Sequence, residues 1–238
     1  MIGDRAYIWL HDRKNSRWQL WFWVLIGKQV FRKKEIACPT EFHGNWVVNP
    51  TGLTKDSVVY SVGVGKDISF DLSMIAKYGV TVHAFDPTPE AVAWVRGQTL
   101  PGEFRLHEYG LADFDGVARF QAPDDPTNTY YSITGGGGGR TIEAQVRRLD
   151  TLMKTLGHQK IDLLKMDIEG AEYGVIDQFA ASDIQVGQLL VEFHHRACGA
   201  SKTRKALRAL GRRGYRIFHV APSLAEYSFL LSPDQASR

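Results

Sequence analysis

One apolar run of the chain ends abruptly in acidic residues. Residues 161–172 read I-D-L-L-K-M-D-I-E-G-A-E, in which the carboxylates Asp167 and Glu169 and a glycine follow the apolar positions. A strand that is buried on both faces of a parallel sheet has this nearly continuous apolar pattern. Ligands of open α/β sheets bind just beyond the carboxyl ends of the strands. The pattern therefore predicts a buried strand whose acids lie at the functional edge of a sheet.

Short β-rich runs alternate with helix-spaced apolar stripes along much of the chain. The first such unit has a strand at residues 58–62, a Gly63-Val64-Gly65 turn, and a helix that Asp67 begins as N-cap and Gly79 ends. Further strands are predicted at residues 80–85, 104–111, 117–121, 141–147, 188–195, 215–220 and 226–231, and further helices at 90–97, 149–156, 171–179 and 201–213. This alternation predicts a doubly wound, Rossmann-like α/β fold.

The last two strands suit a seven-stranded, mostly parallel sheet with an antiparallel C-terminal strand. We expect this domain to span residues 56–238 and to follow a helical and loop extension at residues 1–55. Residues 35–55 read as loop, because prolines and glycines punctuate them.

A second loop, at residues 122–140, contains five consecutive glycines at 135–139. Polyglycine has high backbone entropy, and loops of this length are uncommon unless they cover a site or are disordered. We expect a mobile flap that brings polar side chains to a ligand, namely Asn128, Tyr130, Tyr131 and Ser132. An insertion without a role is the alternative.

The apolar run at residues 18–26 contains three tryptophans and is flanked by lysines and arginines. It is about half as long as the roughly 20 residues that a membrane-spanning helix needs. The run predicts a helix that packs on the domain. A helix lying on a membrane surface is the alternative, because tryptophans with basic flanks suit that environment.

Composition narrows the class of protein only slightly. A hydrophobic content of 44% and a charged content of 23% in 238 residues are typical of soluble globular proteins. A formal net charge of +3 gives no indication of nucleic-acid binding. The two cysteines lie far apart, which excludes a disulfide scaffold and favours a reducing compartment. We therefore expect a cytoplasmic protein with no nucleic-acid partner, with peripheral membrane association as the alternative and the oligomeric state open.

Three features are predicted to meet at one edge of the sheet. Gly63 and Gly65 allow a tight turn close to a ligand, Asp86 ends the following strand, and Asp167 and Glu169 end another. An acid about twenty residues after a glycine turn, at the end of the next strand, indicates an adenosine-containing ligand. The third glycine of a dinucleotide fingerprint is missing, since that position is Ile68, and Asp67 would repel a pyrophosphate. S-adenosylmethionine is therefore favoured over NAD.

Three segments resemble the FkbM-type methyltransferases, a branch of the class I S-adenosylmethionine-dependent enzymes. They read V-V-Y-S-V-G-V-G-K-D-I-S-F-D (58–71), V-H-A-F-D-P-T-P (82–89) and D-L-L-K-M-D-I-E-G-A-E (162–172). The resemblance spans residues 58–195. It implies a Rossmann-like fold and O-methylation of a hydroxyl on a sugar or another small metabolite.

The resemblance also implies which residues hold the cofactor. Gly63, Val64 and Gly65 would flank its methionine part, Asp86 its ribose, and residues 110–113, with Leu111 and Asp113, its adenine. Ser61 occupies a position that usually carries an acid, so Asp67 is a candidate substitute. The implied cofactor residues are Ser61, Gly63, Val64, Gly65, Asp67, Asp86, Leu111, Asp113 and Asp167.

Methyl transfer to a hydroxyl requires an aligned acceptor and a group that takes its proton. We predict that His194 is this base, because imidazole titrates near neutral pH, and that Asp167 positions the acceptor or the cofactor. Glu169 is the third catalytic candidate. Glu172 is expected only to complement the dipole of a helix.

Several alternatives remain at the sequence level. Adjacent histidines at a strand end are often structural residues. A divalent metal could also bind at Asp167, Glu192, His194 and His195, although no spacing demands one. For the whole protein, the alternatives are a methyltransferase fold without activity that serves as a binding module, and an NAD-dependent oxidoreductase.

Overall fold

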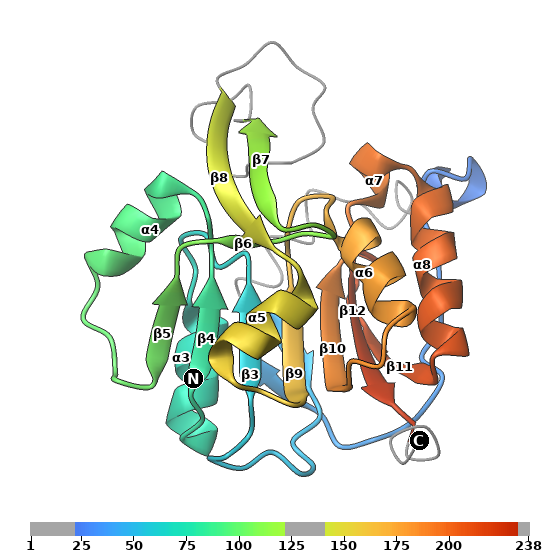
Figure 1. Cartoon of the computed structure of the whole chain (residues 1–238). Helices are drawn as coiled ribbons and strands as arrows, with labels where there is room; N and C mark the ends of the chain where they lie inside the picture. The colour runs from blue at the N-terminus through green and yellow to red at the C-terminus, as the bar shows by residue number, and fades with distance from the viewer. Residues whose placement is uncertain (1–21, 122–140, 233–238) are drawn as a thin grey trace.

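The computed structural model describes residues 22–121 and 141–232. A seven-stranded sheet with strand order β11-β12-β10-β9-β3-β4-β5 forms the centre (Figure 1). The pairs from β10 to β5 are parallel, and β12 is antiparallel to both β10 and β11. The predicted sheet is thus confirmed. Its strands are β3 (Val59–Val62), β4 (Val82–Phe85), β5 (Phe104–His107), β9 (Ile161–Met166), β10 (Val186–Glu192), β11 (Tyr215–Val220) and β12 (Glu226–Leu231).

Helices cover both faces of this sheet. On one face α5 (Leu149–Leu156), α6 (Glu172–Ala180) and α8 (Ala200–Arg212) share a hydrophobic cluster with Leu164 of β9. On the other face α3 (Ser69–Tyr78) and α4 (Pro89–Arg96) share a cluster with Leu163. Neighbouring residues of a strand point to opposite faces, so these adjacent leucines anchor both layers. Figure 1 shows α5, α6 and α8 in front of the sheet and α3 behind it.

Part of the predicted 35–55 loop is a β-hairpin, and the loop prediction is wrong there. β1 (Glu41–His43) and β2 (Trp46–Val48) are antiparallel, and all of β2 is buried. Ser228 Oγ of β12 donates a hydrogen bond to the Val47 carbonyl at 2.8 Å. Three-residue strands give almost no periodicity, and this pair owes its order to packing on the sheet. The hairpin contributes to the core, while the domain boundary at residue 55 stays a prediction.

A second, three-stranded sheet stands beyond the carboxyl edge of the central sheet. It consists of β6 (Gly110–Leu111), β8 (Thr141–Arg147) and β7 (Gly116–Gln121), in that order (Figure 1). The single strand predicted at residues 104–111 is therefore two strands in different sheets, because the chain leaves the central sheet after His107. The strands predicted at 117–121 and 141–147 are confirmed.

Several element boundaries differ from the prediction by one to three residues, and two of these differences bear on the site. Helix α3 has Ile68 as N-cap, and Asp67 instead accepts a hydrogen bond from the Ser69 amide at 2.9 Å. Strand β10 ends at Glu192 and not at residue 195, because His194 is the N-cap of the short helix α7 (His195–Cys198). Gly79 does end α3, in the left-handed conformation that was expected of it.

Two predictions concern segments that the structure describes in part or not at all. The flap residues Asn128, Tyr130, Tyr131 and Ser132 lie outside the described residues. Of the apolar run at 18–26, residues 22–25 are helical, and Phe22 and Leu25 are exposed. Over the described ranges, no helix is both long and apolar enough to cross a membrane.

A cluster of three histidines predicts a loss of stability in acid. His83 Nδ1 lies 3.1 Å from His107 Nε2, and the rings of His83 and His158 are 4.9 Å apart. Burial, together with the charges of the other two histidines and of Arg105, lowers the pKa of His83 from 6.5 to about 4. The unfolded chain therefore binds more protons between these pH values.

We expect His83 to contribute its full stabilisation above pH 6.5 and to lose this contribution as the pH falls from 6.5 towards 4. His83→Phe keeps a ring in this position and removes its titration, so its melting curve should depend less on pH over that range. Thermal unfolding followed by circular dichroism tests this. Identical pH dependence in the two proteins would show that His83 is not responsible.

Candidate active site

The first glycine of the turn after β3 is required by close packing. Gly63 has φ of +74°, and a Cβ at this position would lie 1.7 Å from the Asp167 carbonyl oxygen. Its amide donates to the Phe85 carbonyl at 2.9 Å, and the Asp167 amide donates to the Val62 carbonyl at 3.1 Å. Gly63 therefore allows the ends of three strands to meet. It brings the Asp167 backbone directly beside the turn.

The second glycine has open space where a side chain would be. Gly65 has φ of +52°, and a Cβ there would meet no atom within 4 Å. Its amide donates to Asp86 Oδ2 at 2.9 Å, while Asp86 Oδ1 accepts from the amide and the hydroxyl of Thr88. Asp86 is 5% exposed. It thus holds the turn in place and retains one free lone pair, on Oδ2, for a further donor.

A polar cluster is buried beneath this turn. Ser61 and Asp71 have no exposed surface, and Lys165 Nζ, which donates to the Gly63 carbonyl at 3.3 Å, lies 5.3 Å from the centre of the Trp46 ring. Burial raises the pKa of Asp71, and the charge of Lys165 and the hydroxyl of Ser61 oppose that rise. The acid next to the neutral Ser61 is therefore Asp71 of α3. Asp67, the substitute that we expected, is exposed and turned to the start of its own helix.

The remaining predicted cofactor residues lie in different environments. Val64 and Leu111 are buried in the core, at 3% and 1% exposed. Asp113 is exposed and faces α6, where a Cβ on Gly174 would lie 2.8 Å from its carboxylate. The cofactor roles of all these residues stay predictions.

The acids at the ends of the adjacent strands β9 and β10 lie together. Asp167 follows Met166, whose partner in the sheet is Val191, and Glu192 is the next residue of β10. Burial, opposed by the charges of Lys165 and His194, raises the pKa of Asp167 to about 6. Burial and the neighbouring charges of Asp167 and Glu226 raise the pKa of Glu192 to about 9. Two buried carboxyl groups this close do not both ionise readily, so the pair retains a proton to higher pH than an isolated carboxyl would.

His194 is surrounded by carboxylates. Its Nε2 lies 3.1 Å from Glu169 Oε2 and 3.8 Å from Asp167 Oδ1, and its Nδ1 lies 2.6 Å from Glu172 Oε1. Burial alone would lower the pKa of His194, but the bonds and charges of Glu169 and Glu172 outweigh it and raise the value to about 12. The ring therefore carries a proton at neutral pH. This argues against the predicted role of His194 as the base and makes it a cation that holds the acids in place.

Glu172 has a larger role than helix-dipole complementarity. It is the first residue of α6 and has no exposed surface, and its Oε1 contacts His194. Glu172, Ile176 and Phe179 share the buried face of the helix. The sequence contains a signal for this role, namely a carboxylate at position i with apolar residues at i+4 and i+7. Such a carboxylate lies on the buried face of the helix, where its charge requires a partner.

Glu169, a predicted catalytic residue, has an unusual backbone conformation. Its φ is +52°, which is uncommon for a residue other than glycine. Such conformations persist where the surrounding structure enforces them, and they cluster at functional sites. The strained turn directs the Glu169 carboxylate to His194. His195, by contrast, is 2% exposed, and burial lowers its pKa to about 4, so it belongs to the core.

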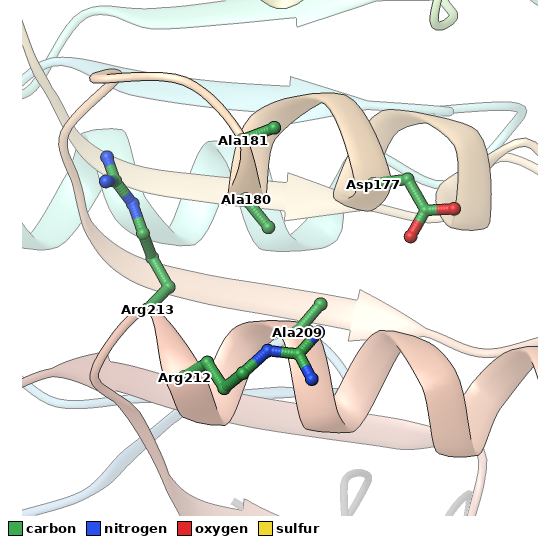
Figure 2. A pocket seen from close by; sticks show the side chains of 6 residues that line it. All are labelled: Asp177, Ala180, Ala181, Ala209, Arg212 and Arg213. Carbon is green, nitrogen blue, oxygen red and sulfur yellow. The ribbon is translucent and has the colours of Figure 1, made fainter.

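A shallow hollow of about 270 Å³ elsewhere on the molecule does not coincide with this site. Its lining comes from the C-terminal parts of α6 and α8 (Figure 2). The residues are Asp177, Ala180, Ala181, Ala209, Arg212 and Arg213. Helices of a parallel α/β fold run opposite to its strands, so this hollow lies away from the carboxyl edge. It contains none of the predicted catalytic residues.

Comparison with known proteins extends this description. The family model "Methyltransferase FkbM domain" matches residues 53–217. Two curated proteins named "Probable methyltransferase-like protein 24" are similar to the chain: the one from Rattus norvegicus is 30% identical over 194 residues and the one from Homo sapiens 28% over 193. Each alignment covers 76% of this chain and 47% of the relative, so the chain spans about half the length of these relatives.

A solved structure is also similar to the chain. It is the methyltransferase FkbM from Methylobacillus flagellatus KT, at 14% identity and a TM-score of 0.47, with 74% of this chain and 44% of that chain covered.

Proposed function

Because the chain belongs to the FkbM methyltransferase family, we propose that it transfers a methyl group from S-adenosylmethionine to a hydroxyl of a small metabolite or sugar. The observation that carries the proposal is the Asp167 carboxylate. It lies at the carboxyl edge of the sheet, with its backbone beside the Gly63 turn and its Oδ1 3.8 Å from His194. A proton acceptor thus lies next to the turn that would bind the cofactor.

The residues at this edge fit S-adenosylmethionine. The open space above Gly65 suits the methionine part, and the remaining lone pair of Asp86 suits a ribose hydroxyl. The chain lacks the third glycine that a pyrophosphate would need. This fit favours the sulfonium cofactor over NAD.

The cofactor, when bound, supplies an activated methyl group on its sulfonium sulfur. The site would align an acceptor hydroxyl with that methyl group, and Asp167 would take the hydroxyl proton. Protonated His194 holds Asp167 and Glu169 on one side of the site, and Glu172 fixes the ring from behind. The chain's own contribution is therefore alignment of the acceptor and removal of its proton.

Calorimetry tests the cofactor assignment. S-adenosylhomocysteine should bind to the full chain with 1:1 stoichiometry, whereas NAD should give no heat of binding. Binding of NAD alone would overturn the assignment and favour an oxidoreductase. Cofactor binding without turnover of any hydroxylated sugar or metabolite in a broad panel would instead favour an inactive binding module.

A further inference from the structure

We propose that Asp167, Glu192 and His194 form a binding site for one divalent cation. One potential ligand atom of each residue lies within 4.8 Å of the other two. The residues come from the end of β9, the end of β10 and the N-cap of α7. The sheet register and a helix start thus bring together three donors that are distant in sequence.

The orientation of His194 is the one that a metal-binding histidine needs. Its Nδ1 is hydrogen-bonded to Glu172, and its Nε2 faces Glu169 at 3.1 Å and Asp167 at 3.8 Å. In the metal-free chain Nε2 carries a proton, so a cation that binds there replaces this proton, which leaves to solvent. Metal-binding histidines characteristically use their second nitrogen to bond a carboxylate, which orients the ring. The arrangement provides a fixed ligand atom supported by a carboxylate behind it.

Glu172 supplies an independent observation that points to a cation. Its side chain has no exposed surface, and its Oε2 has no hydrogen-bond partner among the described residues. Burial of a carboxylate is costly unless positive charge compensates it. Protonated His194 supplies one positive charge, but three carboxylates face its ring. A divalent cation in place of the Nε2 proton would compensate these carboxylates more fully, while Nδ1 continues to donate to Glu172.

The site is also accessible and adjustable. The side chains of His194 and Asp167 are 16% and 26% exposed, so an ion can enter from solvent. Ligand atoms around a bound cation lie roughly 3 to 4 Å apart, for bonds of about 2.1 Å, so small side-chain rotations suffice. Glu169 Oε2, which is 3.1 Å from Nε2, would turn aside or become a fourth ligand.

The donor set indicates the class of ion. Carboxylate oxygens suit Mg²⁺, Ca²⁺ and Mn²⁺, whereas an imidazole nitrogen suits transition metals. Mn²⁺ satisfies both preferences. The second oxygen of Asp167 remains available to an acceptor hydroxyl, whose pKa a neighbouring cation would lower; this last consequence rests on the proposed methyl transfer.

Manganese binding to the metal-free full chain tests the proposal without cofactor or acceptor. Titration followed by electron paramagnetic resonance should give one Mn²⁺ per chain, with electron spin echo modulation from one imidazole nitrogen. Glu192→Gln is nearly isosteric and should weaken binding by at least ~10-fold, as should Glu172→Gln through the ring of His194. His194→Gln should abolish the nitrogen modulation. Asp177→Asn, in the hollow of Figure 2, should bind Mn²⁺ like the unaltered protein.

Absence of Mn²⁺ binding at millimolar concentration, or equal binding by the unaltered protein and a folded Glu192→Gln variant, would overturn the inference. Failure of the metal site is distinguishable from failure of the proposed function. Calorimetry with S-adenosylhomocysteine in the presence of a chelator reports on cofactor binding alone. Cofactor binding without Mn²⁺ binding would therefore overturn only the proposed cation site.

Discussion

Gly63→Ala is expected to destabilise the protein by about 3 to 5 kcal/mol, which is the sum of an overpacking cost and a backbone cost. The new Cβ would lie 1.7 Å from the Asp167 carbonyl oxygen, and the backbone has φ of +74°. No side-chain rotation relieves a clash between a Cβ and a main-chain oxygen. The ends of β3 and β9 would have to separate, with loss of the hydrogen bond from the Asp167 amide to the Val62 carbonyl.

Gly65→Ala is the matched control, two residues away. Its φ of +52° is also left-handed, but its Cβ would meet open space. We expect a cost of only about 1 to 2 kcal/mol from the backbone. Urea unfolding of the three proteins measures both effects. Equal midpoints for the two alanine variants would show that the contact with Asp167 is not what requires glycine at position 63.

Asp167→Asn is expected to lower the turnover of methyl transfer by about 10²- to 10⁴-fold, the usual contribution of general acid–base catalysis. The amide has the shape of the carboxylate and does not accept the hydroxyl proton. Because the Asp167 backbone, not its side chain, contacts the Gly63 turn, binding of S-adenosylhomocysteine should change by less than about threefold, well under the 1.4 kcal/mol of a tenfold change.

Turnover and calorimetry on the same protein preparation separate these effects. Asp177→Asn changes an exposed carboxylate that pairs with Lys205 on the surface and should leave turnover unaltered. Full turnover by the Asp167→Asn variant would show that Asp167 is not the base. A parallel loss of cofactor affinity would instead assign its side chain to cofactor binding.

The sheet could be predicted from sequence because its central strands carry their own signal. Residues 58–62 and 161–166 are apolar on both faces, and this pattern is typical of buried parallel strands. The doubly wound fold class followed from the alternation of strands and helices. The local sequence pattern was therefore sufficient to predict the strands that are buried on both faces.

Roles within the site were harder to predict, because they depend on contacts between distant segments. Gly63 has the expected turn conformation, but it is needed for packing on Asp167, 104 positions further along the chain. His194 resembled a neutral base until the structure placed Glu169 and Glu172 beside both of its nitrogens. Spacing in sequence cannot report the electrostatic environment that sets a pKa.

The small sheet beyond the carboxyl edge has a consequence for protein engineering. Gln121 at the end of β7 and Thr141 at the start of β8 are cross-strand partners, so these two positions lie side by side in the paired strands. A connection of almost any length can join such ends, since loop-closure entropy grows slowly with length. This junction is therefore a suitable position for grafting foreign segments above the site while the central sheet is left intact.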